Sequence, residues 1–215
     1  MNKGFTITYE YGSNLYVNTT NRCDLDCEFC VRHNSHLGDV EADDLWLKCE
    51  PSVDEIVDSI EKRDLSKYNQ LVFCGFGEPS ERFDDICRVI DRLKADGHIL
   101  FTRMDTNGTG NVINGRDICP DMKGRFNKVS ISLNTDSSGK YDAICHPNFN
   151  GAYDAMKSFA KEVQKYVPEV MMTVVDCISQ EEIENCRRIC EQEIGAVYRV
   201  RSFITEDRDE NEKNT

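Results

Sequence analysis

The cysteines with the most informative spacing are Cys23, Cys27 and Cys30, which form a C-x3-C-x2-C pattern directly after an expected strand. Thiolates bind soft metals, and closely spaced thiolates on one loop can ligate adjacent corners of an iron–sulfur cluster. Three protein ligands leave one iron of a four-iron cluster without a protein ligand. A catalytic metal centre needs such an open position, whereas a structural one does not. The spacing therefore indicates a catalytic iron–sulfur site.

A structural zinc site is the alternative for the same segment. Cys27 and Cys30 form a metal-binding pair, and His33 and His36 follow as further possible ligands. A structural zinc site usually has a second ligand pair about a dozen residues away, so that the chain can fold back on the metal. Here the four ligands are crowded together and Cys23 is left over, which favours the cluster.

A second segment runs from an apolar strand, residues 70–74, into Gly75 and Gly77 and then Glu78-Pro79. Glycines let the backbone turn sharply and present its N–H and C=O groups to a ligand at the end of the strand. Taken alone, an ordinary strand-to-helix turn would explain this segment equally well.

Two further strands carry polar residues where a parallel strand is expected to be apolar on both faces. The period of two puts Arg103 and Asp105 on one face of the first, and Ser130, Ser132 and Asn134 on one face of the second. Buried polar groups need partners or a ligand, so these strands predict a polar lumen.

The last expected strand places Arg199, Arg201 and Phe203 on one face, although arginines on an edge strand are often simply solvated. All these polar segments lie at or near the C-terminal ends of expected parallel strands. Active sites of α/β folds assemble at that end of the sheet. Their shared position is stronger support for a site than any one segment.

The elements that must position these residues follow from apolar periodicity. The expected strands are residues 5–9, 14–18, 70–74, 99–105, 128–134, 169–175 and 196–203, and the expected helices are residues 52–63, 82–95, 151–167 and 180–194. Capping boxes begin the first and last helix. Alternation at this spacing predicts an α/β fold with a parallel sheet. About six strands are fewer than the eight of a closed barrel, leaving a doubly wound sheet or, as we predict, a partial (βα)6 TIM-like barrel.

Composition narrows the class of protein. The 215 residues carry 26 basic and 39 acidic side chains, a net charge of −13, which argues against a binder of duplex nucleic acid. No apolar run approaches the roughly 18–20 residues of a membrane span, and no apolar signal core is visible. An odd number of cysteines, eleven, favours free thiols in the cytoplasm over disulfides. We expect one domain, residues 1–204, and a disordered acidic tail, residues 205–215.

Together these motifs resemble those of the radical S-adenosylmethionine (SAM) superfamily, from about Leu15 to Phe203. The C-x3-C-x2-C loop, with Phe29 before its last cysteine, is similar to the cluster motif of the superfamily. Residues 76–79, FGEP, resemble its GGEP motif, with phenylalanine in place of the first glycine. The strand ending in DTNG and the strand SISLN match two further regions. The strings FCGFGEP, SISLN, TVVD and YRVR resemble most closely the TatD-linked (TatD nuclease-associated) radical SAM family.

The resemblance implies an enzyme in which Cys23, Cys27 and Cys30 hold a 4Fe-4S cluster, whose fourth iron is chelated by SAM. Reductive cleavage of SAM would generate a 5′-deoxyadenosyl radical that abstracts hydrogen from an unknown substrate. It further implies a one-electron donor such as flavodoxin or ferredoxin and a possible functional link to a TatD-type hydrolase. Residues expected to bind the cofactors are Phe29, Phe76, Gly77, Glu78, Pro79, Arg103, Asp105, Asn107, Ser132, Asn134 and Arg201. We expect Arg103 to bind the SAM carboxylate, with a salt bridge to Asp105 as the alternative.

Other functions stay open at this level. Within the superfamily, a glycyl-radical activase or a deazaguanine synthase-like enzyme is similarly compact, and a zinc-stabilised binding or scaffold protein is the non-enzymatic alternative. The remaining cysteines are scattered or on apolar helix faces, so we expect a single cluster. Residues 31–50 form a long insertion, which we expect either to cap the substrate side or to be a mobile connector.

Overall fold

The computed structural model describes residues 6–33, 36–37, 40–41 and 45–203, and its centre is one seven-stranded sheet. The strands, in spatial order, are β1 (Thr8–Tyr11), β2 (Asn14–Val17), β5 (Gln70–Phe73), β6 (Thr102–Thr106), β7 (Lys128–Ser132), β8 (Glu169–Val175) and β9 (Val197–Arg201). β1 pairs with β2 antiparallel, and every other pair in the sheet is parallel. The six parallel strands from β2 to β9 confirm the predicted α/β architecture.

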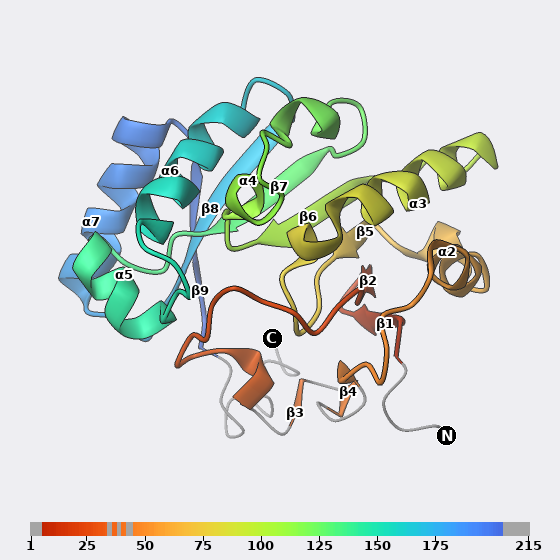
Figure 1. Ribbon diagram of the computed structural model, residues 1–215, viewed down its shortest axis with the longest axis horizontal. Helices are drawn as coiled ribbons and strands as arrows, with labels where there is room; N and C mark the ends of the chain where they lie inside the picture. The colour runs from red at the N-terminus through yellow and green to blue at the C-terminus, as the bar shows by residue number, and fades with distance from the viewer. Residues whose placement is uncertain (1–5, 34–35, 38–39, 42–44, 204–215) are drawn as a thin grey trace.

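Helices gather on one side of this sheet, as Figure 1 shows. They are α2 (Val53–Glu61), α3 (Phe83–Ala95), α4 (Gly110–Ile113), α5 (Ser138–Cys145), α6 (Ala152–Val163) and α7 (Gln180–Arg188), which continues as a π-helix (Ile189–Ile194). Short 3-10 turns cover Val31–His33, Leu65–Lys67, Pro79–Arg82 and Cys119–Met122, and β3 (His36–Leu37) pairs with β4 (Val40–Glu41). The strand–helix order leaves the other face of the sheet for the site.

The sequence determines where two of these helices begin. Ser52 accepts a hydrogen bond from the Glu55 backbone and the Glu55 side chain reaches back, a capping box that begins α2. Ser179 and Glu182 repeat the arrangement at the start of α7. Each box satisfies backbone N–H groups that lack partners in the first turn. Both predicted capping boxes are confirmed.

The core lies between the helices and the outer face of the sheet. On β7, Val129 and Ile131 are fully buried, whereas Ser130 and Ser132 are half-buried on the opposite face. Full burial of a large apolar side chain contributes about 1.5–3 kcal/mol, which fixes the register of the strand. The predicted division of this strand into an apolar and a polar face is confirmed.

Several predicted boundaries are wrong. β6 begins at Thr102 rather than residue 99, because Ile99 is 99% exposed and has no strand beside it. β7 ends at Ser132, and Asn134 takes a left-handed conformation (φ 63°) in place of strand geometry. α4 and α5 were not predicted, whereas the helix predicted over residues 180–194 is present and becomes π-helical from Ile189. The weakly amphipathic sequence of α5, which includes Gly139, gives little helical periodicity to detect.

Three further predictions concern membrane spans, the C-terminal tail and the cysteines. No helix in the described part is long and apolar enough to cross a membrane. The predicted tail, residues 205–215, lies outside the described residues, so the domain boundary stays a prediction. All eleven cysteines are free thiols, as the composition predicts.

Candidate functional site

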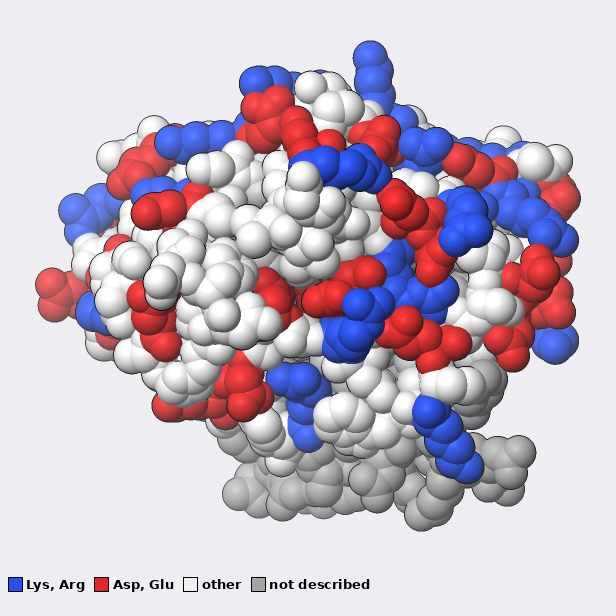
Figure 2. Space-filling model, viewed as in Figure 1, with Lys and Arg blue, Asp and Glu red and all other residues white. Residues whose placement is uncertain are grey.

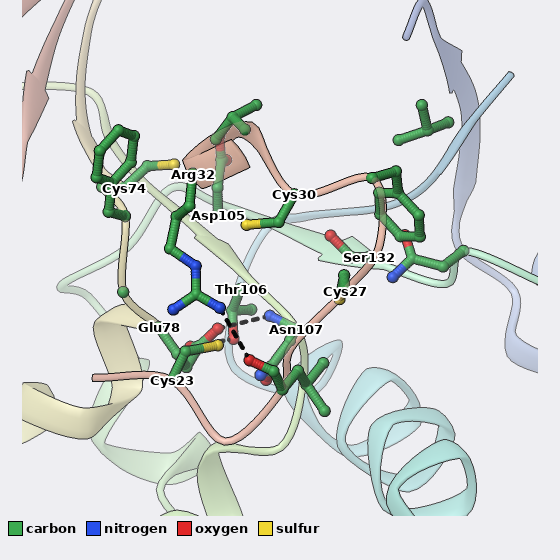
Figure 3. A pocket seen from close by; sticks show the side chains of 18 of the residues that line it. Cys23, Cys27, Cys30, Arg32, Cys74, Glu78, Asp105, Thr106, Asn107 and Ser132 are labelled. Carbon is green, nitrogen blue, oxygen red and sulfur yellow. Dashed lines mark hydrogen bonds between the residues drawn. The ribbon is translucent and has the colours of Figure 1, made fainter. Parts of the chain in front are cut away.

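A cavity of about 200 Å³ opens at the C-terminal ends of β5, β6 and β7, and the three spaced cysteines line it (Figure 3). The predicted site residues that line it are Cys23, Cys27, Phe29, Cys30, Phe76, Gly77, Glu78, Pro79, Asp105, Asn107, Ser132, Asn134 and Arg201. Arg103 is the predicted site residue that does not. Segments more than 170 residues apart in the sequence, from Cys23 to Arg201, therefore meet in one place.

The cysteine loop is held from behind by the end of α5. The backbone N–H groups of Asp26 and Glu28 donate to the carbonyls of Cys145 and Ile144, both at 3.0 Å. These hydrogen bonds fix the loop without using any thiol of the C-x3-C-x2-C pattern as a support. The backbone that carries the three cysteines is thus shaped by the fold itself.

A buried hydrogen bond joins the same loop to the end of β6. The Asn107 side chain donates to Asp24 Oδ1 at 2.6 Å and accepts from the backbone and hydroxyl of Thr109. Asp24 and Asn107 are both buried. Asn107 therefore positions the cysteine loop as well as lining the cavity, which explains why the TNG segment and the cysteine loop come together.

The surroundings of Cys23 and Cys27 keep these two thiols protonated. Burial raises the pKa of Cys23 to about 12. The pKa of Cys27 is also raised, because its sulfur lies against Cys145 and because it is buried. A metal or cluster must displace these protons, since the thiolate is the ligand. In Figure 3 the guanidinium of Arg32 reaches among the thiols.

Arg32 supplies a positive charge where thiolates would carry negative ones. Its Nη2 donates to the Leu25 carbonyl at 3.2 Å and to Asp26 Oδ1 at 3.3 Å. Burial alone would lower the pKa of Arg32, but the facing sulfurs of Cys30 and Cys23 raise it above its usual value. Arg32 remains charged beside these sulfurs.

Three thiolate donors on one loop suit an iron–sulfur cluster by their chemistry. Within the described residues, no group of three or more His, Cys, Asp or Glu side chains converges closely enough to hold a single ion. The three thiols instead surround a shared cavity. Beside them the Asn134 Oδ1 atom is buried and has no hydrogen-bond partner in the described part of the chain, so it is available to a ligand donor.

The glycine motif is packed directly against the segment between β2 and the cysteine loop. Gly77 N donates to the Thr20 carbonyl at 3.0 Å, and Glu78 N donates to the Arg22 carbonyl at 2.8 Å. A Cβ at residue 77 would lie 2.4 Å from the Thr20 oxygen. Glycine is therefore required here by the close approach of two backbones. At residue 75, a Cβ would overlap the Asn18 side chain, 2.1 Å away.

The buried Glu78 carboxylate links the glycine motif to the end of β6 by hydrogen bonds. Its carboxylate accepts hydrogen bonds from the Thr106 hydroxyl at 2.6 Å, the Asn107 backbone at 2.7 Å and the Ser80 hydroxyl at 2.7 Å. Burial nevertheless raises its pKa to about 7. Glu78 is therefore a positioning residue in this structure, with its side chain turned into the protein.

Arg103 lies in a neighbouring cavity on the concave face of the sheet. Its guanidinium pairs with Asp105, with Nε 2.8 Å from Oδ1, and donates to the Tyr16 hydroxyl and to Gln70 Oε1, both at 2.9 Å. The salt bridge to Asp105 that the sequence left open is present. With these partners, Arg103 is held away from the cysteine cavity.

Sequence reasoning did not find Asp24, Arg32, Cys74 and Cys145, which either line the cavity or support its loop. Arg32 and Asp24 stand within or next to the cysteine pattern, so proximity to that pattern was an available signal. Cys74 directly follows β5 and precedes the glycine motif. Cys145 lies at the end of an unexpected helix, and no local signal connects it with the loop.

The family model of the radical SAM superfamily matches residues 17–190, which includes the cysteine loop and the parallel strands β5 to β8. The chain belongs to the radical SAM superfamily. The predicted superfamily and enzyme class are thereby confirmed, and the family implies SAM and a 4Fe-4S cluster as cofactors. The narrower TatD-linked resemblance is not among these findings.

Two curated relatives show how far the sequence similarity extends. The probable GTP 3',8-cyclase of Pyrococcus horikoshii is 25% identical over 189 residues, 87% of this chain and 55% of the relative. A probable dual-specificity RNA methyltransferase RlmN of Caldanaerobacter subterraneus is 31% identical over 90 residues, 41% of this chain and 23% of the relative. The chain thus spans little more than half the length of the cyclase and about a quarter of the length of the methyltransferase.

Solved structures support the same fold. A radical SAM methyltransferase from Sphaerobacter thermophilus superimposes with a TM-score of 0.63 at 16% identity, covering 91% of this chain and 57% of that one. Streptococcus suis SuiB bound to S-adenosylmethionine gives a TM-score of 0.59 at 16% identity, covering 88% and 40%. At these identities the likeness concerns the fold, which agrees with the predicted partial barrel.

Proposed function

We propose that Cys23, Cys27 and Cys30 hold a 4Fe-4S cluster, and that the cavity beside them binds SAM for hydrogen abstraction from a substrate. The observation that carries this proposal is the convergence of the three thiols and the glycine motif on one cavity. When bound, such a cluster supplies the electron that cleaves SAM to methionine and a 5′-deoxyadenosyl radical. The remaining residues bind and orient the cosubstrate and exclude water.

The glycine motif provides acceptors for the SAM amino group. The N–H groups of Gly77 and Glu78 already donate to carbonyls of the segment between β2 and the cysteine loop. In the described structure no hydrogen bond uses the carbonyls of Gly75, Phe76 or Gly77. These carbonyls are therefore available to an ammonium group, and a charge-assisted hydrogen bond of this kind is stronger than a neutral one.

Polar groups along the opposite wall suit the rest of the cosubstrate. Asn134 offers its buried, unpaired Oδ1 atom to a hydroxyl or amino donor. Ser132 lies beside it at the end of β7, and the apolar rings of Phe29 and Phe76 complete the lining. We assign the SAM-binding role to Phe29, Phe76, Gly77, Glu78, Pro79, Asp105, Asn107, Ser132, Asn134 and Arg201, with Glu78 acting through its backbone.

The test is anaerobic reconstitution with iron and sulfide. We expect a brown protein with about four irons per chain that forms 5′-deoxyadenosine from SAM and dithionite. Cys27→Ala should lose the colour and the product. Cys177→Ala is the matched control, because Cys177 is exposed and lies outside the cavity. A brown, active Cys27→Ala variant, or a colourless wild-type chain with one equivalent of zinc, would overturn the proposal.

We extend the proposal to the TatD-linked radical SAM family, with flavodoxin or ferredoxin as electron donor and the cytoplasm as compartment. The order of the strings FCGFGEP, SISLN and YRVR supports the family assignment. The eleven free thiols suit a reducing compartment. Co-purification with a TatD-type hydrolase from the source organism would support the functional link, and reduction of the cluster by neither donor would exclude both.

A further inference from the structure

A second cavity, of about 330 Å³, lies on the concave face of the sheet next to the cysteine cavity. The register places its polar residues in rows across neighbouring strands. Asp105 on β6 pairs with Ser130 on β7, and Thr173 on β8 pairs with Arg199 on β9. The cavity is large enough for a small metabolite. It is lined by several polar side chains where a parallel sheet is usually apolar.

The charge in this cavity is opposite to that of the whole chain. Four cationic side chains line it, those of Arg103, Lys128, Arg199 and Arg201, against one carboxylate, Asp105. The chain as a whole carries a net charge of −13. A cationic cavity in an acidic protein is a local feature that the average composition does not explain.

Two of the four cations have their own counter-ions. Arg103 pairs with Asp105, and Lys128 pairs with Glu169 at 2.5 Å. Arg199 and Arg201 have no carboxylate within ion-pair distance in the part of the chain that the structure describes. On the face shown in Figure 2, by contrast, acidic and basic side chains are interspersed over the helices. The two β9 arginines therefore leave a net positive charge at the cavity.

The opposite wall is aromatic and already ordered. The Tyr16 hydroxyl accepts a hydrogen bond from Arg103, whose guanidinium carbon lies 5.8 Å from the Tyr16 ring centroid. Tyr11 packs edge-on against Tyr16, with ring centroids 5.9 Å apart. No hydrogen bond donated by Tyr16 is found among the described residues, so its O–H is available to an acceptor. Arg103 thus orients this wall without contacting the cysteine cavity.

The two cavities share a wall made of Asp105, Ser132, Arg201, Ser202 and Phe203. A molecule in the second cavity would therefore be adjacent to one in the first. We propose that the concave cavity is the substrate site and that it binds a small anion, a carboxylate or phosphate ester, through Arg199 with Tyr16 as an additional donor, while Arg201 lies on the wall shared with the SAM cavity. This inference rests on the proposed function for its meaning as a substrate site.

Anion binding can be measured on the cluster-free chain, so its outcome is independent of cofactor loading. The probes are inorganic phosphate and succinate at low salt, with glycerol as the neutral comparison, followed by isothermal titration calorimetry. We expect binding of at least one anion and no binding of glycerol. Which of the two anions binds more tightly indicates whether the substrate is a phosphate ester or a carboxylate.

Arg199→Gln should lower the affinity for the anion that binds more tightly by about tenfold or more, since a hydrogen bond to a charged group is lost. Arg188→Gln removes the same charge from the exposed surface of α7 and should change affinity by less than about twofold. Arg199→Lys, which keeps the charge, should recover part of the loss, and circular dichroism checks that each variant is folded.

Two results would overturn the inference. One is that the folded wild-type chain binds neither anion better than glycerol. The other is that Arg188→Gln and Arg199→Gln weaken binding equally, which would mean a diffuse effect of net charge. If anions bind as expected but SAM is not cleaved after reconstitution, the proposed function fails and the anion site stands. If SAM is cleaved but no anion binds, this inference alone fails.

Discussion

Replacing Gly77 by alanine tests whether contact between the glycine motif and the cysteine loop assembles the cavity. The added Cβ would lie 2.4 Å from the Thr20 carbonyl oxygen and 2.5 Å from that of Arg22. Both atoms belong to the backbone and cannot rotate away as a flexible side chain could. The two segments must therefore separate for the methyl group to fit.

Separation would disrupt two hydrogen bonds, from Gly77 N to the Thr20 carbonyl and from Glu78 N to the Arg22 carbonyl. Each such bond contributes about 0.5–1.5 kcal/mol, and overpacking of a closely packed region costs about 1–3 kcal/mol. We therefore expect Gly77→Ala to lower the free energy of unfolding by about 2–6 kcal/mol. That is a large fraction of the stability of a typical domain.

Urea unfolding of the cluster-free chain, followed by circular dichroism, measures this loss, and iron content after reconstitution reports on the cavity. Gly139→Ala is the matched control, because Gly139 is exposed on α5 and its added Cβ would meet no atom within 4 Å. Alanine in a helix should leave that variant up to about 1 kcal/mol more stable. Wild-type stability and full iron loading in Gly77→Ala would refute the reasoning.

Two further predictions concern Glu78 and Phe76, which line the same cavity. Because burial raises the pKa of Glu78 from its usual 4.5 to about 7, the folded state holds this proton more tightly than the unfolded state. Its contribution to stability is complete below pH 4.5 and is lost as the pH rises through 7, by at most about 3 kcal/mol. The free energy of unfolding should therefore depend on pH differently in wild type and in Glu78→Gln across this range. Parallel curves for the two proteins would contradict the raised pKa of Glu78. Trp46, the single tryptophan, packs on Phe76 with ring centroids 5.0 Å apart, and Phe76 lines the cavity. Cluster loading should quench its fluorescence in wild type but not in Cys27→Ala, and unchanged emission at full iron content would exclude a cluster near Phe76.

Spacing along the chain was sufficient to predict the parts of the site that are local. The cysteine pattern and the glycine motif each occupy a few consecutive residues, and each follows a strand whose end the apolar pattern indicates. The rule that sites form at the C-terminal ends of parallel strands then brings them together. Neither step needs a contact between distant side chains.

The partners of Arg103 could not be predicted in this way. Tyr16 is 87 residues away and reaches Arg103 because β2, β5 and β6 are neighbours in the sheet. Their register brings a hydroxyl, an amide and a carboxylate around one guanidinium. Sequence periodicity predicts the face of the sheet on which Arg103 lies. Whether Arg103 pairs with Asp105 or with a cosubstrate depends on the order of the strands in the sheet.

The insertion of residues 31–50 illustrates the same limit. Part of it lies outside the described residues, but Leu45 and Leu47 are tied to the loop after β2. The Asn18 amide donates to the Leu45 carbonyl at 2.6 Å, and the Asn21 amide donates to the Leu47 carbonyl at 2.7 Å. The end of the insertion is thus anchored beside the glycine motif, whereas its role as a cap over substrate stays a prediction.

The cysteine loop is supported from two sides by contacts that do not involve its thiols. The end of α5 holds its backbone, and Asn107 holds the buried carboxylate of Asp24. Cys23 and Cys27 are left protonated around a cavity that Arg32 enters. Because these contacts come from the protein itself, we expect cluster loading to require loss of thiol protons rather than refolding of the loop.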